Sequence, residues 1–574
     1  MLTEGATTGT IHSLSSNCTD RSSGRMPVVG SPIKLNWFVP VLFSVLLSIV
    51  WSPSPAYSTL NENLPLEHWA YPVIDELLLR GYGSKLLYGN RPYTRGEIAK
   101  LVIEVEDAAY GVSAREGRTL RDWAGVLREE LAHEIDELSS WSGENTLRMH
   151  VEIGVDVIGS KTGKDIELEP AFEDIRRGDD GDPHLRAVTP LSFAIALNEH
   201  LTIAETALID SEMRNDPTAR VKGDPKRPLR FRSAYLKYSR PHIEFQFGRE
   251  RFRWGPGRSG GLVLGDTSPS FDAGLLKLRA KWFTLTSIIS QLNDESPEAG
   301  ETNVAEPDSG IVNRYFYAHR LDMKFLPWLE IGFSETAVVT GVGRMFDLRF
   351  MNPFHSFYTV QHEGGRVQRE VNLSQSLHWQ IAYFPGIVLY GEFLVDELIL
   401  KKRTEGALPR PNNLGFLQGV VFTDPFDMYG TTVRGEYVRI NSFTYVHRGI
   451  NTDYEHFGSP IGHPFGPDTD QTSLLVSKTL NREMRISGGF AYRRRGEIRL
   501  DTEDEALGAN TSFLHGVVER RRTYSASVSY RPRGDLFVKL DTSYISISNM
   551  ENITGQSEGL FDLTLLLSYR MNWF

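Results

Sequence analysis

The sequence has 574 residues, of which 40% are hydrophobic and 11% aromatic, so it is long enough for two or more ordinary domains. Its formal net charge of −11 excludes the strongly basic surface that nucleic-acid binding requires, and no nucleic-acid partner is expected. The single cysteine, Cys18, excludes intrachain disulfides and thiolate metal clusters.

Residues 1–58 are predicted to be an N-terminal extension followed by an export signal. The stretch "LNWFVPVLFSVLLSIVW" (35–51) is apolar, and "AYS" (56–58) offers a small residue at both positions that signal peptidase reads before a cut after Ser58. The apolar stretch is too short for a membrane-spanning helix. Because Cys18 lies in the part that export removes, the mature chain carries no thiol nucleophile.

Residues 59–146 are predicted to form a small α-helical domain in the periplasm, because their apolar residues recur at helical spacing. Three helices are expected. Pro72 and Gly81 mark the two ends of the first. The capping box "TRGE" (94–97) precedes the second, and the capping box "SARE" (113–116) precedes a third that runs to Leu138.

Within this domain, residues 68–102 resemble a shortened S-layer-homology module, a type of module that can bind cell-wall polymers. The resemblance implies peptidoglycan as a partner. The plainer alternative, which we favour, is a helical bundle with a periplasmic or plugging role.

From residue 147 onward, apolar residues recur with a period of two. In "TYSASVSY" (523–530) one face carries the tyrosines, alanine and valine and the other carries only hydroxyl groups. The last strand alternates in the same way from Phe561 to Trp573. Strands of about 9–11 residues with an apolar outside and a polar inside are typical of transmembrane barrels, since lipid offers backbone amides no partner. The fold class is therefore mainly β, with residues 147–574 forming a large antiparallel outer-membrane β-barrel of about 16–18 strands.

The connections between these strands alternate between short and long. Tight turns are predicted at "LNRE" (480–483) and "RPRGD" (531–535), and long loops at about 449–470 and 500–522. In outer-membrane barrels the short turns face the periplasm and the long loops face outside. Residues 431–449 fit either one long strand or a bent pair.

One segment, "GRERFRWGPGRSGGLVLGD" (248–266), combines arginines with glycine-rich turns but lacks the spacing of a phosphate-binding loop. Three of its arginines continue the apolar face of the preceding strand, and an arginine at the lipid midplane costs about 2–4 kcal/mol. Either a bulge at Gly248 turns them into the lumen, or the strand has reached the headgroups by Arg249. Trp254 is expected near the external rim, in a rim loop or in one folded into the mouth of the barrel.

These side chains suit an acidic polysaccharide, because guanidinium groups bind carboxylates and aromatic faces stack on sugar rings. The alternative, to which we give equal weight, is that the arginines pair with lumen carboxylates and only stabilise the wall. The candidate polysaccharide-binding residues are Arg249, Arg251, Arg253, Trp254, Arg258, Asp266, His463 and Asp468.

No metal and no cofactor are expected. In "GSPIGHPFGPDTD" (458–470) the spacing of His463, Asp468 and Asp470 matches no metal-ligand pattern, and "RGDDGDP" (177–183) resembles a calcium loop only in composition. The spacings G-x-S-x-G and H-E-x-x-H yield no convincing catalytic set, so the protein is not expected to be an enzyme. A barrel hydrolase assembled from separate strands is the minor alternative.

Four segments in this order resemble the Wzi-type family of capsule assembly outer-membrane proteins, and the likeness extends over residues 65–574. They are "GRERFRWGPGRSGGLVLGD" (248–266), "LYGEFLVDEL" (389–398), "NNLGFLQGVVF" (412–422) and "YEHFGSPIGHPFGPDTD" (454–470).

The resemblance implies an eighteen-stranded barrel with a helical domain at its periplasmic end, in the outer membrane of a Gram-negative-type cell. It also implies a lectin-like role in which capsular or extracellular polysaccharide is held at the cell surface without chemical turnover, with outer-membrane lipid as the second partner. The alternative is a porin-like channel anchored to the cell wall by its helical domain.

Overall fold

The computed structural model divides the chain into two compact units, Met1–Pro55 and Ala56–Phe574, and every described residue belongs to the second. The structure describes residues 59–140, 148–162, 184–211, 229–294, 311–363, 371–397, 412–447, 451–502 and 513–573. The predicted export signal and the loop at 177–183 lie outside these ranges. Within them, no helix is long and apolar enough to cross a bilayer.

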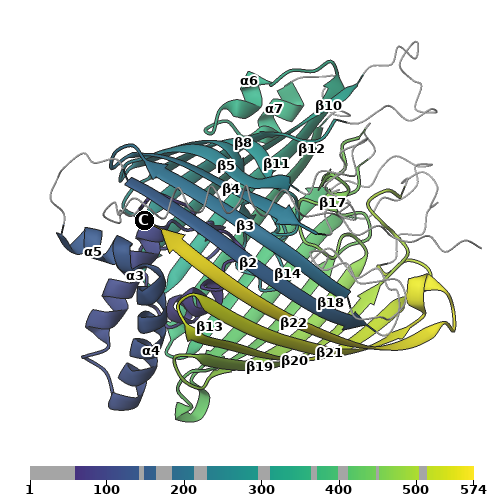
Figure 1. Ribbon diagram of the computed structural model, residues 1–574. Helices are drawn as coiled ribbons and strands as arrows, with labels where there is room; N and C mark the ends of the chain where they lie inside the picture. The colour runs from purple at the N-terminus through teal and green to yellow at the C-terminus, as the bar shows by residue number, and fades with distance from the viewer. Residues whose placement is uncertain are drawn as a thin grey trace, which may run out of the picture. The chain divides into compact units, whose positions relative to one another are not determined.

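The helical domain, called the head below, precedes the strands (Figure 1). Its described helices are α2 (Tyr71–Leu79), α3 (Arg95–Ala108), α4 (Ala114–Glu130) and α5 (Ala132–Ser140). Thr94 forms the predicted capping box, and the Ser113 hydroxyl accepts a hydrogen bond from the Glu116 amide at the start of α4. These predicted helix starts are confirmed.

The predicted third helix is wrong in one respect, since it consists of two helices. Leu131 ends α4 with φ −114° and ψ 25°, outside the helical region. The chain bends there, and Leu127, Leu131 and Ile135 all remain buried in the core of the head. The apolar residues keep their helical spacing across this break, so the break could not be predicted from the sequence.

Eighteen antiparallel strands form a closed barrel (Figure 1), which confirms the predicted fold class and agrees with the upper strand count. In wall order they are β2 (Arg148–Thr162), β3 (His184–Ala196), β4 (Leu201–Asp210), β5 (Leu229–Ser239), β6 (Ile243–Glu250), β8 (Phe271–Arg279), β9 (Phe283–Gln291), β10 (Val312–Leu326), β11 (Leu329–Val342), β12 (Val371–Phe384), β13 (Ile387–Glu397), β14 (Asn413–Thr423), β15 (Thr431–Ile440), β18 (Thr469–Thr479), β19 (Met484–Arg495), β20 (Glu519–Arg533), β21 (Leu536–Ser548) and β22 (Ser557–Trp573). The last strand closes on the first, in a register that runs from Val151↔Trp573 to Thr162↔Asp562.

The wall alternates as predicted. On β22, Phe561, Leu563 and Leu565 are exposed on the outer face, whereas Asp562 and Thr564 are buried on the inner face. Tyr524 on β20 is likewise exposed. Aromatic side chains gather where strands meet short turns, among them Trp282, Phe283, Phe325, Tyr383 and Phe384, as in the interfacial girdle of a membrane barrel.

Short and long connections alternate around the barrel, as predicted. Only two residues separate β10 from β11, whereas β15 and β18 are separated by residues 441–468. Within the described part of residues 431–449, which ends at 447, neither alternative holds, because β15 ends at Ile440 and the chain then turns inward. The Tyr445 amide donates to Asp396 at 2.9 Å, and this contact holds the turn against the inside of the wall.

The lumen is filled from both ends. From the head, Asn63 donates to Gln246 and Glu250 on β6 at 3.0 and 2.9 Å, and Asn90 donates to Asp322 on β10 at 3.1 Å. From the other end, the long connection 251–270 and the described residues 441–447 and 451–468 fold inward. One hydrophobic core runs continuously from the head through both connections.

Candidate functional site

The segment 248–266 leaves the wall without a bulge. Strand β6 keeps an unbroken register with β5 up to Arg249 and with β8 up to Glu250, although Gly248 has φ +130°, a conformation that favours glycine. Arg249 therefore stays on the outer face, where it pairs with the exposed Asp272 of β8 at 2.5 Å. The predicted bulge is wrong, and the alternative, that the strand has reached the headgroups by Arg249, stays a prediction.

Beyond Glu250 the chain enters the lumen. Arg253–Trp254 form β7, which pairs with β1 (Asn90–Arg91) of the head. The Gly255 amide donates to the Gly89 carbonyl at 3.0 Å, and the Trp254 side chain is only 1% exposed. The rim-loop prediction is wrong because the head offers backbone partners inside the barrel. The alternative, a loop folded into the mouth of the barrel, agrees better with the structure, although Trp254 lies deeper than the mouth.

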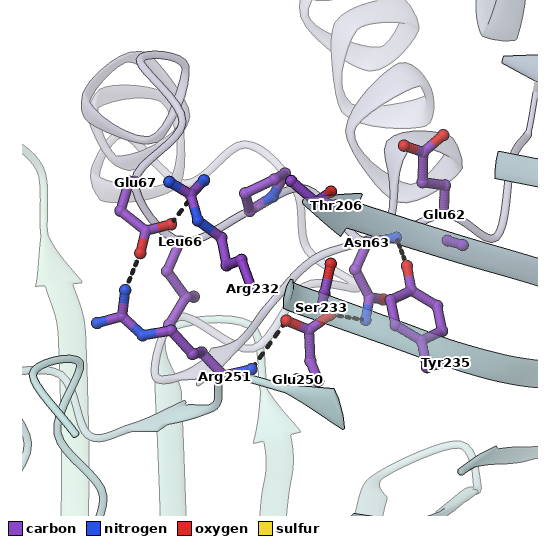
Figure 2. Close-up of a pocket in the computed structure, with 12 residues that line it drawn as sticks. Glu62, Asn63, Leu66, Glu67, Thr206, Arg232, Ser233, Tyr235, Glu250 and Arg251 are labelled. Atoms are coloured by element: carbon purple, nitrogen blue, oxygen red, sulfur yellow. Dashed lines mark hydrogen bonds and ion pairs between the residues drawn. The ribbon is translucent and has the colours of Figure 1, made fainter. Parts of the chain in front are cut away.

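The next two arginines pair with carboxylates of the head and of their own loop. Arg251 pairs with Glu67, and Figure 2 shows that carboxylate between Arg251 and Arg232 of β5, the latter at 3.6 Å. Arg253 pairs with Asp266 at 3.3 Å. These contacts support the bracing alternative for both arginines, although neither partner is a residue of the wall. The cavity beside Glu67 measures about 20 Å³, which suits water and not a sugar ring.

Two wall carboxylates that the sequence did not single out anchor this loop. Glu436 of β15 accepts hydrogen bonds from the amides of Arg258 and Ser259 at 2.7 and 2.9 Å and from Tyr390 at 2.6 Å. Glu392 of β13 accepts from the Leu262 amide at 2.9 Å. A buried carboxylate that accepts backbone hydrogen bonds fixes a loop firmly. Glu436 and Glu392 therefore hold the loop 251–270 against the wall.

Asp468 has a structural position. Its carboxylate accepts hydrogen bonds from Ser442 at 2.7 Å and from the amides of Leu514 and His515 at 3.0 Å each. These donors belong to two different long connections. Asp468 therefore ties the external loops together from a fully buried place.

His463 lies beside Ser259, and residues 257–261 ("GRSGG") have the spacing G-x-S-x-G. The two side chains are 3.1 Å apart, but Nδ1 of His463 accepts a hydrogen bond from the Phe465 amide, so its proton is on Nε2. His463 then donates to Ser259, which in turn donates to Glu436 at 2.5 Å. A catalytic histidine must accept the serine proton, so this geometry does not suit a hydrolase.

Burial lowers the pKa of His463 to about 4, so the ring is neutral near pH 7 and offers no cation to an acidic polymer. Its ordinary value is 6.5, and between these values the unfolded chain takes up a proton that the folded chain does not. The stabilisation is therefore complete above about pH 6.5 and declines as the pH falls toward 4. Acidification from pH 7.5 to 5 should cost about 2 kcal/mol through this residue.

The temperature of the heat-modifiable electrophoretic shift, measured at both pH values, checks this prediction. The variant His463→Gln keeps a donor toward Ser259 but has no titrating ring, so its shift should depend less on pH than that of the wild type. Equal pH dependence in the two proteins would show that His463 does not titrate as described.

Arg258 differs from the other arginines of the segment. Its side chain keeps an exposed surface inside the lumen, and the described residues form no hydrogen bond or ion pair with its guanidinium. The protein around this loop limits the access of water and lowers the pKa of Arg258, and Arg434 adds to this effect, whereas the carboxylates of Asp75 and Glu436 oppose it. Among the arginines of this segment, Arg258 is therefore the one that forms no ion pair with a described residue.

A possible metal-binding group lies on the inner wall, where ligand atoms of Asp322, Glu330 and His378 lie within 4.8 Å of one another. Arg320 donates to Asp322 at 2.8 Å and to Nε2 of His378 at 2.6 Å, and Asn90 takes the other oxygen of Asp322. The guanidinium of Arg320 thus already bonds to two of the three possible metal ligands, Asp322 and His378. We assign this group to bracing of the head and not to a cation.

Comparisons with known proteins match a family model and a number of solved structures. The family model for the capsule assembly protein Wzi matches residues 105–559. The structure is similar to Wzi of Escherichia coli, described as a carbohydrate-binding β-barrel of group 1 capsule assembly, with 14% identity and a TM-score of 0.56 over 88% of this chain and 99% of that one. At this identity the likeness concerns the fold.

The structure also matches two Pseudomonas aeruginosa proteins at TM-scores below 0.5. OccK3 matches with 10% identity and a TM-score of 0.41 over 74% of this chain and 96% of that one. OccK10 matches with 11% identity and a TM-score of 0.42 over 75% and 100%. No curated protein matches the sequence.

Proposed function

Because this chain belongs to the Wzi family of capsule assembly proteins, as the match over residues 105–559 shows, we propose that it binds capsular polysaccharide and holds it at the cell surface. The resemblance that the sequence motifs predicted is confirmed. The family is one of assembly proteins, so the prediction that the chain is not an enzyme is confirmed as well. The structural likeness to a carbohydrate-binding barrel supports the proposal.

The plugged lumen is the observation that carries this proposal. A porin-like channel needs a continuous water path, whereas here the head and the loop 251–270 meet through β1 and β7 in the middle of the barrel. Glu392 and Glu436 fasten that loop to the wall. A barrel that is closed in this way suits the holding of a polymer better than its passage.

We propose that the barrel lies in the outer membrane with the head in the periplasm. The head contacts short turns, which face the periplasm in such barrels: Arg80 pairs with Asp424 at 2.9 Å, and Arg482 pairs with Glu129. The exposed apolar face of the wall supports outer-membrane lipid as a partner. Peptidoglycan is not proposed as a partner, because Asn90 of the segment 68–102 enters the lumen and bonds to Asp322 there.

The eight candidate residues are proposed to act in two roles. Arg258 presents its guanidinium to carboxylates of the polymer, and Arg249 does so only by exchanging its partner Asp272 for the polymer. The other six hold the frame that positions them, and they are Arg251, Arg253, Trp254, Asp266, His463 and Asp468.

Complementation of a deletion strain tests both the function and the site. Cells without the gene should shed polysaccharide, and wild-type protein should restore attachment. Arg258→Gln should fold normally but retain at least roughly tenfold less polymer, because a hydrogen bond to a charged group contributes about 1.5–3 kcal/mol. Cell-attached and shed polysaccharide are measured by staining, and folding by the heat-modifiable shift.

The matched control is Arg482→Gln, the same change at an exposed arginine of a short turn, which should retain polymer as the wild type does. Unchanged attachment in the deletion strain would contradict the proposed function. Wild-type attachment by Arg258→Gln would contradict the site and leave the function standing.

A further inference from the structure

A helical lobe lies on the outside of the barrel. It consists of residues 343–363, called the wall lobe below, and contains α6 (Leu348–Met351) and α7 (Phe357–Glu363). Figure 1 shows both helices beside β10–β12. On β10, Phe316 packs on Tyr454 of a lumen loop and Arg320 bonds to Gly89 of the head, so the alternate residues of β10 point outward.

The wall lobe packs on these outward residues through aromatic contacts. The ring centroids of Tyr315 and Phe346 are 4.5 Å apart, those of Tyr317 and Phe350 are 5.5 Å apart, and His319 lies 4.2 Å from Phe357. These residues form a hydrophobic cluster separate from the core of the lumen. The lobe is therefore part of the folded outer wall.

A polar cluster lies under the lobe on the same outer face. Glu335 of β11 pairs with His319 at 2.9 Å and accepts hydrogen bonds from the Ser356 hydroxyl at 2.9 Å and the Phe357 amide at 3.0 Å. Gln375 of β12 adds a fourth contact at 2.5 Å. Both Ser356 and Phe357 belong to the lobe, so the lobe supplies half of these partners and closes the cluster off.

The depth of this cluster places it at the level of the apolar belt. Glu335 is six residues beyond Leu329, where β11 leaves its short turn beside the exposed aromatic residue Phe325. A tilted strand climbs roughly 2.5 Å per residue, so Glu335 lies roughly 15 Å above that turn, within an apolar band about 25 Å tall. A carboxylate facing lipid there is costly, and the lobe is what shields it.

The other side of the wall lobe exposes large apolar side chains beside one ion pair, Arg349 with Asp347. Leu348 and Phe354 are each 77% exposed, and Met345 and Tyr358 are also largely exposed. This surface continues the outer face of β11, where Phe333 is exposed. The wall lobe thus has exposed apolar residues on one side and lies at the level of the apolar band of the barrel, as an interfacial amphipathic segment does.

We propose that the wall lobe is a membrane-binding element whose exposed side lies in the outer leaflet, at the boundary between acyl chains and headgroups. Continuity with the apolar wall favours lipid as the occupant over a second copy of the chain. The lobe thus binds lipid with one side and covers the Glu335 cluster with the other.

Site-directed spin labelling tests this proposal. Residues 59–574 contain no cysteine, so a nitroxide can be attached at a single site in the mature chain. It is placed at Leu348→Cys or Phe354→Cys, and the protein is reconstituted in nanodiscs of phosphatidylcholine and phosphatidylglycerol. Two reference sites calibrate the measurement: Leu565→Cys on the outer wall, 47% exposed, and Tyr110→Cys in the head, 85% exposed. Accessibility to oxygen and to a soluble nickel chelate is measured at each.

The ratio of oxygen to nickel accessibility at positions 348 and 354 should match that at 565 and exceed that at 110 severalfold. A ratio like that at 110 would overturn the proposal, because the lobe would then face water. Protection from both reagents would also overturn it, since protein would then cover the surface. If position 565 itself were aqueous, the outer-membrane assignment would fail, and the lobe's assignment with it.

Discussion

Replacing Glu76 by alanine is expected to weaken the attachment of the head to the barrel by about 3–5 kcal/mol, because a buried ion pair loses one partner. This carboxylate of α2 accepts hydrogen bonds from Arg80 at 2.6 Å, from Thr432 of β15 at 2.5 Å and from Arg485 of β19 at 2.6 Å. The variant leaves two arginines without the carboxylate they share. The heat-modifiable shift should occur at lower temperature, and proteolysis of residues 59–140 should be faster.

Glu129→Ala is the matched control, since Glu129 also joins the head to the barrel but is 46% exposed in its pair with Arg482. An exposed pair contributes about 0–1 kcal/mol, so little change is expected. Burial opposes ionisation of Glu76, but Arg485 and Arg80 prevail and hold its pKa below the ordinary 4.5. Its stabilisation is therefore complete above pH 4.5 and lost on further acidification, where the wild type should approach the variant. Equal effects of the two substitutions would contradict the prediction.

Replacing Glu436 by alanine is expected to loosen the loop that plugs the lumen. Four hydrogen bonds lose their acceptor, from the amides of Arg258 and Ser259 and from the hydroxyl groups of Ser259 and Tyr390. A hydrogen bond to a charged group contributes about 1.5–3 kcal/mol, and we expect a total loss of about 3–5 kcal/mol because the loop relaxes. In planar bilayers the wild type should be almost closed and the variant should conduct.

Asp272→Ala is the control for this experiment. Asp272 also pairs with an arginine of the 248–266 segment, but on the outer face, where it is 61% exposed. Its removal should leave the conductance unchanged. A Glu436→Ala protein that stays closed and melts as the wild type does would show that the loop is held by other contacts.

The strands could be predicted because a strand in the wall of a membrane barrel alternates apolar and polar residues with a period of two. The alternation from Phe561 to Trp573 is such a case, since lipid on one side and polar groups on the other select each residue in turn. The start of α3 could be predicted from Thr94 and Glu97, because a capping box is a local interaction between residues close in sequence.

The path of the 251–266 segment could not be predicted in the same way. Strands β1 and β7 are two residues long each and lie more than 160 positions apart, so neither leaves a periodic signal. Glu436 looks like any other inward-facing polar residue of an alternating strand, although it holds the plug. The partner of Arg251 is Glu67, a residue of the head that nothing in the local sequence connects to the barrel.

The pairing of β1 with β7 also determines where a mechanical load travels. A polymer bound to the 251–266 segment would not strain only that loop if it were pulled. We expect the tension to pass through the pairing of Asn90–Arg91 with Arg253–Trp254 into the head. Because the head also forms ion pairs with Asp424 and Arg482 of the short turns, part of the load would reach the wall at those turns.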